Sequence, residues 1–364
     1  MGLGDIKGVL GGVAISRRSL LKAAAASSAA LTMPAVWTSA RAERKLVVRD
    51  PGGEYLTAFG EAFYEPFTKE TGIAITNATS EPDPIGQIRA MVETKNYVWD
   101  VALIAIAPTL TAVEWGVCEE IAPAGGPGAF LSKIPEHMRT PYILGTNVFA
   151  TVMAYRTDTM KKAPRDWKDF WDLDGLPGVR SLYKAPFDTL EFALLADGVD
   201  PANLYPLDLD RAFKKLDQVK DQIKIWWSTG AQTSQLLSSG EADVVSAWNG
   251  RAQLAINDGS PVALNWNQSL WTYEGWVILK GGPNVDLCRE FVEFCAQGKQ
   301  QALYTKSLAY GPTALDAYDH IDPAIAKTLP TYPENFKQSI EVNAKYWAQH
   351  QETAQDRFNA WLLG

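Results

Sequence analysis

Apolar runs of strand type alternate with amphipathic helical patterns along the chain from residue 45 onward. Strands are predicted at 45–49, 73–76, 100–104, 148–155, 178–182, 223–227, 242–247 and 275–279. Helices are predicted at 55–70, 85–94, 108–115, 165–171, 190–196, 209–219, 233–239, 287–297 and, as one polar helix, 335–362. Strands and helices that alternate in this way build a parallel sheet with helices on both faces. The pattern therefore predicts an α/β fold.

The alternation restarts after residue 155, which indicates a second lobe. Because the strand at 275–279 returns after the second set of strands, we expect lobe 1 to comprise residues 46–150 plus 272–318. Lobe 2 then comprises residues 151–271 plus 319–364. Parallel sheets bind ligands beyond the carboxyl ends of their strands, so the loops at those ends are the expected site.

The first 42 residues carry the pattern of an export signal. Arg17 and Arg18 precede a Ser-Leu-Leu-Lys segment, an apolar run follows at 23–36, and an Ala-x-Ala site ends at Ala42. The arginine pair resembles the twin-arginine signal, which exports folded proteins. The apolar run is too short and too rich in Ala, Ser and Thr for a stable membrane span. We expect cleavage after Ala42 and a mature protein in the periplasm.

The charge of the chain argues against nucleic-acid binding. The formal net charge is −8 over 364 residues, and the first 42 residues contribute +4, which leaves −12 for the remaining 322. A surface this acidic repels phosphate backbones. The cysteines Cys118, Cys288 and Cys295 are too few for a disulfide scaffold, and the last two lie about 10 Å apart along a predicted helix. We expect three buried thiols.

No pattern typical of a catalytic or cofactor site stands out. The sequence contains no G-x-S-x-G, P-loop or G-x-G-x-x-G pattern, and its three histidines lack metal-ligand spacing. We therefore expect neither an enzyme nor a bound metal or other cofactor. Tryptophan is the unusual feature, since six of thirteen lie between residues 226 and 276. Trp227 and Trp248 each end a predicted strand, where an aromatic face can contact an alkyl chain or an ammonium group.

Four segments carry a resemblance to a known family. They are 242–250 (ADVVSAWNG), 69–73 (KETGI), 97–101 (YVWDV) and 310–313 (YGPT). In this order they resemble the extracellular solute-binding proteins of ABC importers, and in particular the spermidine/putrescine-binding group. The resemblance implies a two-lobed type II periplasmic-binding-protein fold with crossing hinge strands, which closes around one solute. It also implies a monomer that docks on a permease in the inner membrane.

The resemblance supplies candidate ligand contacts. The acid and the tyrosine of the family's first loop are kept at Glu54 and Tyr55, one acid of its second patch at Asp188, and its W-N-G segment at Trp248 and Asn249. The complete predicted set is Glu54, Tyr55, Asp188, Trp227, Trp248, Asn249, Arg251, Trp271 and Tyr273.

The number of acids narrows the expected solute. The family's W-x-D segment reads Trp-Thr-Tyr at 271–273, so its acid is absent, and Glu54 and Asp188 supply at most two carboxylates. A polyamine needs about one buried carboxylate per ammonium group. Arg251, if it faces the site, can bind a carboxylate in bidentate geometry. The predicted solute is therefore a small amine, either a polyamine or an amino-acid-like amine such as 4-aminobutyrate.

Other functions on the same fold stay open. Stacked tryptophans together with Asn249, Arg251 and Asn267 are compatible with a sugar, and an opine is a further alternative. A thiaminase-like enzyme would need a reactive cysteine in the cleft. An iron-binding relative would need adjacent tyrosines, which the sequence lacks.

Overall fold

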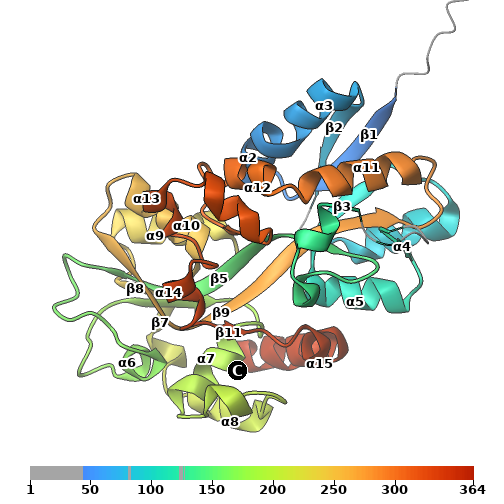
Figure 1. The fold of residues 1–364 in the computed structure, drawn as a ribbon. Coiled ribbons are helices and arrows are strands. Elements are labelled where there is room, and N and C mark those ends of the chain that lie inside the picture. Colours follow the sequence, from blue (N-terminus) through green and yellow to red (C-terminus); the bar gives the residue numbers. More distant parts are fainter. Residues whose placement is uncertain (1–43, 81–82, 123–125, 127) are drawn as a thin grey trace, which may run out of the picture. The chain divides into compact units, whose positions relative to one another are not determined.

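Eight strands of the described part of the chain form the main path of one mixed sheet, in the order β2-β1-β3-β9-β5-β8-β6-β7 (Figure 1). The computed structural model describes residues 44–80, 83–122, 126 and 128–364. The strands are β1 (Lys45–Asp50), β2 (Ala74–Thr79), β3 (Val101–Ala105), β5 (Leu144–Arg156), β6 (Arg180–Tyr183), β7 (Ile223–Trp227), β8 (Val244–Trp248) and β9 (Val262–Leu279). The two-residue strands β4 (Cys118–Glu119) and β11 (Ile340–Glu341) pair with β9, and β10 (Gly311–Pro312) pairs with β5.

Two long strands connect two sets of parallel strands. In the first parallel set, β1 is parallel to β2 and β3; in the second, β6 is parallel to β7 and β8. β5 and β9 run antiparallel to their neighbours in the main path, and they pair with each other from Leu144↔Trp276 to Arg156↔Val262. β9 pairs with β3 of the first set and β5 with β8 of the second, so the two strands together connect the sets, as expected. The strand predicted at 275–279 is only the last part of an 18-residue strand.

The first long helix agrees with the helix predicted from the sequence pattern. α2 (Glu54–Phe59), a π-helical segment (Gly60–Tyr64) and α3 (Glu65–Thr71) follow one another without a break, where the sequence predicts a helix over 55–70. Gly72 ends the helix with a φ of 71°, a left-handed conformation that glycine adopts at no steric cost. The other helices are α4 (Ile85–Thr94), α5 (Ile106–Glu114), α6 (Trp167–Trp171), α7 (Thr189–Ala196), α8 (Leu209–Leu216), α9 (Gly230–Ser239), α10 (Asn249–Asn257), α11 (Val285–Cys295), α12 (Gly298–Tyr304), α13 (Pro323–Ala326), α14 (Pro333–Phe336) and α15 (Ala344–Leu363).

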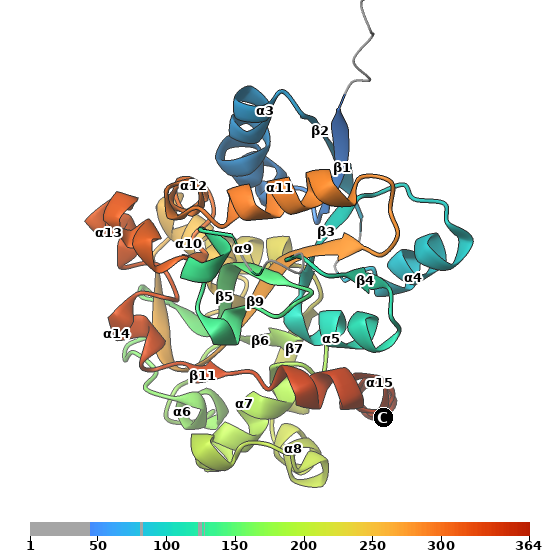
Figure 2. The ribbon, with the colours of Figure 1, turned by 45° about the vertical axis from the view of Figure 1, so that its right-hand side comes forward.

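The C-terminal segment differs from the single helix predicted over 335–362. α14 ends at Phe336, β11 then pairs with β9, and α15 begins only at Ala344. Asn343 caps α15 by accepting a hydrogen bond from the Tyr346 backbone N–H at 2.9 Å, which fixes the start of the helix. The prediction of one helix is wrong because the strand pairing depends on β9, which is distant in sequence. α15 lies beside α5 (Figure 2).

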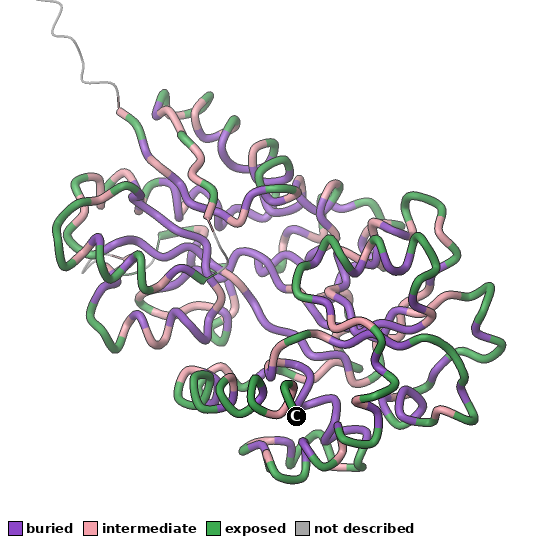
Figure 3. Tube along the Cα trace, turned by 180° about the vertical axis from the view of Figure 1, so that it is seen from behind, coloured by how far each residue is buried: buried purple, intermediate pink, exposed green. Residues whose placement is uncertain are grey.

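Buried apolar side chains gather in three clusters around the sheet, and Figure 3 shows long buried stretches along its strands. The largest cluster combines residues from 46–152 with residues from 271–329, and the second lies mainly within 153–223 and α15. This division resembles the two predicted lobes, with a few exceptions. The first cluster also contains residues of predicted lobe 2, namely Val152, Trp271, Ile321, Ala326 and Leu329, and the second contains Ala107 of predicted lobe 1. Because the main strands share one sheet, the lobe boundaries stay a prediction.

The three cysteines Cys118, Cys288 and Cys295 are free and buried, which confirms the expected thiols. Among the residues that the structure describes, no group of His, Cys, Asp and Glu side chains could hold a metal ion. None of the described helices is long and apolar enough to span a membrane. The export signal predicted at 1–42 lies outside the described residues.

Candidate functional site

The two crossing strands present a polar face between the two parallel sets. Cross-strand partners point to the same face of a sheet. β5 pairs with β9 at Asn147↔Glu274 and Phe149↔Thr272, and Thr151 lies two residues farther along β5. We call these five residues the floor of the candidate site. β1 and β3 end on one side of the floor and β6 and β8 on the other, where parallel sheets bind their ligands.

Glu274 is a partly buried carboxylate on the floor. It accepts hydrogen bonds from the Tyr55 hydroxyl at 2.5 Å and from Asn147 Nδ2 at 2.9 Å. Burial raises the pKa of Glu274 to about 7, while the Asp83 carboxylate and the Arg49 guanidinium act on it in opposite directions. The Glu274 carboxyl therefore gains or loses its proton near neutral pH. It contacts Tyr55, which follows the end of β1.

This pKa predicts a pH-dependent stability. The folded protein holds the Glu274 proton up to about pH 7, whereas the usual value is 4.5. Because the folded state binds the proton more tightly than the unfolded state, the free energy of unfolding decreases as the pH rises from about 4.5 to about 7. The loss is about 3 kcal/mol for such a shift. In urea unfolding at pH 5, 6, 7 and 8, Glu274→Gln should flatten this decrease, and the exposed Glu70→Gln should not. A wild-type stability that rises over this range would contradict the assignment.

A pair of buried carboxylates, Asp188 and Glu191, follows β6. Asp188 accepts a hydrogen bond from Thr151 Oγ1 at 2.5 Å, and Glu191 accepts hydrogen bonds from the Tyr205 hydroxyl at 2.8 Å and Trp347 Nε1 at 2.7 Å. The other oxygen of each, Oδ1 and Oε2, has no hydrogen-bond partner among the described residues. Burial raises the pKa of Asp188 well above its usual range, with a further rise from Glu191, and burial raises that of Glu191 to about 7. Within the described chain, neither forms an ion pair, so this pair lacks a compensating cation.

Three aromatic rings lie together at the ends of the second parallel set. Tyr183 stacks on Trp227 with ring centroids 4.3 Å apart, and Trp248 meets both rings edge-on, at 5.8 Å from Tyr183 and 5.3 Å from Trp227. Phe149 of the floor contacts the edge of Trp248 at 6.2 Å. Trp227 is completely buried, so Tyr183 and Trp248 are the rings that remain partly accessible to a ligand.

Tyr183 is affected by carboxylates from both sides of the floor. Burial, together with the smaller effect of the negative charges of Asp188 and Asp83, raises its pKa to about 12. Asp188 follows β6 of the second parallel set, whereas Asp83 precedes α4 next to the first. Carboxylates from both sides of the floor therefore act on the Tyr183 phenol.

Arg251 supplies positive charge to the same region. Its guanidinium forms an ion pair with Glu54, the first residue of α2. Arg251 Nε and Trp248 Nε1 are buried and have no hydrogen-bond partner in the described part of the chain. A Cβ atom at Gly230 would lie 2.8 Å from Arg251 Nε and 2.9 Å from Trp248 Cε3, so glycine gives both side chains their space. Two buried N–H donors without an acceptor cost about 1–3 kcal/mol each, which an anion could offset.

Two members of the predicted set stabilise their surroundings. Asn249 Nδ2 donates a hydrogen bond to the Ala309 carbonyl at 2.6 Å, and Asn249 Oδ1 accepts one from the Ala150 backbone N–H at 3.0 Å. Trp227 is covered by Tyr183, and its Nε1 donates a hydrogen bond to the buried Ser246 hydroxyl at 3.3 Å. Both residues lie next to the candidate site, and their contact with a solute stays a prediction.

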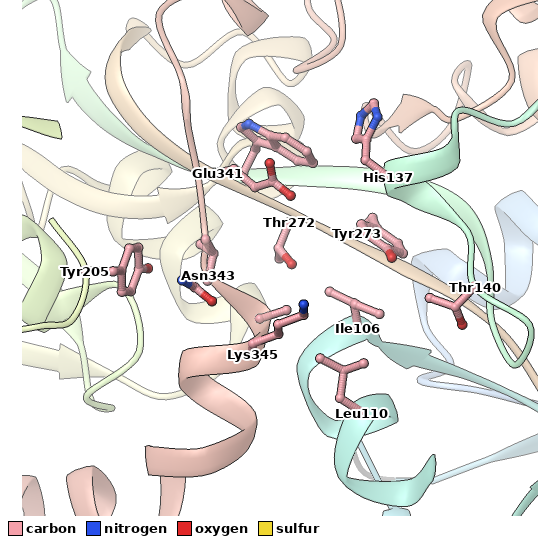
Figure 4. A pocket seen from close by; sticks show the side chains of 13 residues that line it. Ile106, Leu110, His137, Thr140, Tyr205, Thr272, Tyr273, Glu341, Asn343 and Lys345 are labelled. Carbon is pink, nitrogen blue, oxygen red and sulfur yellow. The ribbon is translucent and has the colours of Figure 1, made fainter. Parts of the chain in front are cut away.

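Trp271 and Tyr273 lie away from the other predicted residues. They alternate with Thr272 and Glu274 along β9 and therefore point to the opposite face. The Trp271 ring contacts Phe336, with centroids 4.9 Å apart. Both residues line a cavity of about 440 Å³ beside the edge of β9 (Figure 4). Thr272 of the floor also lines this cavity, together with Ile106, Leu110, His137, Thr140, Tyr205, Glu341, Val342, Asn343, Ala344 and Lys345. The structure thus does not bring the nine predicted residues around one space.

The set predicted from the sequence lacks Tyr183, Glu191 and all five residues of the floor, among them Glu274. The region holds the acids Glu191 and Glu274 in addition to Glu54 and Asp188, the two carboxylates counted from the sequence. Glu191 follows Asp188 by three residues, a spacing that places both carboxyls at the start of α7 and could have identified the pair. Glu274 is the neighbour of Tyr273, but only the register of β9 shows which of the two faces the floor.

Comparisons with known proteins agree with this architecture. The family model for "Bacterial extracellular solute-binding protein" matches residues 62–334. A gamma-aminobutyric acid-binding protein of Pseudomonas aeruginosa is 34% identical over 325 residues, which are 87% of this chain and 91% of the relative. An ABC transporter substrate-binding protein from Bradyrhizobium japonicum has 34% identity and a TM-score of 0.81, with 87% and 99% of the two chains covered.

A second similar structure contains agropinic acid. The periplasmic binding protein AgtB from Agrobacterium tumefaciens R10, in complex with agropinic acid, has 34% identity and a TM-score of 0.77. The match covers 88% of this chain and 99% of that protein. The α/β fold with crossing strands that the sequence predicts is shared with these solved proteins and is confirmed.

Proposed function

This chain belongs to the family of bacterial extracellular solute-binding proteins, and on that premise we propose that its solute is a small zwitterionic amine of the 4-aminobutyrate type. The prediction of a transport role without catalysis is confirmed by the family. The observation that carries the proposed solute is the buried pair Asp188 and Glu191, which has two unpartnered oxygens and no compensating cation.

The acid pair favours an ammonium group. Two buried carboxyls close to each other resist double ionisation, and a cation that replaces their missing partner reduces this cost. An ammonium group carries three donors and no acceptor, which suits the free Asp188 Oδ1 and Glu191 Oε2. The neighbouring Tyr183 and Trp248 rings can contact the alkyl chain of the same solute.

The opposite end of the solute is expected at Arg251. A guanidinium binds a carboxylate through two parallel hydrogen bonds, and Arg251 Nε together with Trp248 Nε1 offers unused donors there. A diamine such as putrescine would place its second ammonium near this positive charge. A zwitterion therefore fits the charges better than a polyamine.

An opine is the second candidate, because the cavity beside β9 adds about 440 Å³ of space that begins at Thr272 of the floor. A short amino acid does not need this volume. An opine, which carries a larger substituent on its amine, could extend into it. The relative AgtB, in complex with agropinic acid, supports the same alternative.

Isothermal titration calorimetry on refolded mature protein tests the proposal. The probes are 4-aminobutyrate, putrescine, agropinic acid and maltose. We expect 4-aminobutyrate to bind most tightly and, at 100 times its Kd, to add about 2.7 kcal/mol to the free energy of unfolding. Tight binding of agropinic acid alone would select the opine, whereas binding of putrescine alone or of maltose alone would contradict the zwitterionic site.

The proposed role includes export through the twin-arginine route and delivery of the solute, as a monomer, to an ABC permease in the inner membrane. The support is the Arg17–Arg18 pair ahead of the apolar run. Replacement of both arginines by lysine should leave the precursor in the cytoplasm, as measured by fractionation and immunoblotting. A matched Lys7→Arg variant should export normally. Normal export of the double lysine variant would argue for a different route.

A further inference from the structure

Arg251 is paired in the structure with a carboxylate of the protein itself. Glu54 begins α2, directly after the loop that ends β1, whereas Arg251 lies in α10 after β8. The ion pair therefore joins residues from the two parallel sets. The Glu54 side chain is 40% exposed and that of Arg251 only 13%. Glu54 can thus turn into water, while Arg251 stays largely fixed.

The ion pair leaves one N–H donor of the Arg251 guanidinium without an acceptor. The ion pair joins Arg251 Nη1 to Glu54 Oε2, and Arg251 Nε remains without an acceptor among the described residues. Trp248 Nε1 is a second buried donor of the same kind, and both side chains pack against the position of Gly230. A carboxylate that accepted hydrogen bonds from Arg251 Nε and Trp248 Nε1 would satisfy the two donors that Glu54 leaves without a partner.

We propose that Glu54 competes with the solute carboxylate for Arg251. When the solute binds, its carboxylate displaces Glu54 from the Arg251 guanidinium. This inference rests on the proposed zwitterionic solute. Two carboxylates at one guanidinium repel each other, and the half-exposed one leaves at the lower cost because water solvates it. Glu54 thereby keeps the buried arginine neutralised until a solute arrives. It also lowers the affinity for weak or misplaced anions.

The alternative role for Glu54 is a latch that holds the two parallel sets together. The two roles predict opposite effects of removing the charge. A competitor, once neutralised, lets solutes with a carboxylate bind more tightly and leaves other amines unaffected. A latch, once neutralised, weakens every solute to a similar degree, because the closed arrangement itself becomes less stable.

The test compares Glu54→Gln with wild type by calorimetry, using 4-aminobutyrate and its neutral analogue 4-aminobutanamide. Glu61→Gln, an exposed position on the same continuous helix, is the matched control. We expect Glu54→Gln to lower the Kd of 4-aminobutyrate by about five- to tenfold and to change that of the amide by less than twofold. Unchanged affinity for 4-aminobutyrate, or a parallel loss for both probes, would overturn the proposal.

A second measurement keeps the inference testable if 4-aminobutyrate is not the solute. Acetate is titrated while the Trp248 indole N–H resonance is followed by NMR, with the signal assigned through Trp248→Phe. We expect acetate to shift this resonance, and at lower concentrations in Glu54→Gln than in wild type. If neither calorimetric probe binds but acetate behaves this way, the proposed solute fails and the competitor role stands. An unshifted resonance in both proteins would refute the anion site.

Discussion

Asp188→Asn should remove most of the binding of an amine and leave the fold intact. The substitution replaces a buried carboxylate by a neutral amide of the same shape, which can still accept the hydrogen bond from Thr151 Oγ1. A lost charged hydrogen bond to an ammonium group corresponds to about a hundredfold higher Kd. The φ of Asp188 is 67°, and asparagine tolerates positive φ at least as well as aspartate.

Although Asp188→Asn should weaken binding, it should increase the free energy of unfolding at pH 8. The pKa of Asp188 in the folded protein lies well above its usual value, because of burial and the charge of Glu191. Wild-type stability therefore decreases as the pH rises above the ordinary aspartate range, and Asp188→Asn removes that decrease. Calorimetric binding and urea unfolding at pH 8 measure the two effects, with the exposed Asp221→Asn as control. Wild-type affinity in Asp188→Asn would exclude this acid pair as the ammonium site.

Arg251→Met should separate solutes by their charge. Truncation of a buried guanidinium that binds a carboxylate in two hydrogen bonds costs about a hundredfold in affinity. Putrescine, which has no carboxylate, should lose less than threefold or gain. The substitution is best made in the Glu54→Gln background, because Arg251 is the ion-pair partner of Glu54.

The control for this variant is Lys299→Met, an exposed position that removes the same charge. Competition binding with 4-aminobutyrate and putrescine gives the two affinities. Equal losses for both solutes would mean that Arg251 maintains the shape of the site and does not recognise a carboxylate.

Local patterns in the sequence predict several elements well. The helix α4 (Ile85–Thr94) and the strand β7 (Ile223–Trp227) have the predicted bounds, since each is a strongly patterned segment between clear turn signals. The buried state of the cysteines also follows from composition and spacing. Such properties depend on residues close to each other in the chain.

The composition of the site depends on contacts between distant residues. Tyr273 and Glu274 are adjacent, and the pairing of β9 with β5 decides that Glu274 faces Asn147 and Tyr55. Glu54 and Arg251 were both predicted to meet the solute, but they lie 197 positions apart, and only the folded chain shows that they pair with each other. Periodicity does not contain this information, so the expected set took Trp271 and Tyr273 from the face of β9 that points away from the floor.

The 18-residue strand β9 also limits how this protein can evolve. Insertion or deletion of one residue between Leu270 and Glu274 would exchange the two faces of the strand and turn Glu274 away from Tyr55. Changes in length should therefore be tolerated in the loops after β1 and β6 but not in this segment. New solute specificities in descendants of this chain should arise from substitutions along β9 and from insertions in those loops, and aligned relatives should show no gaps across it.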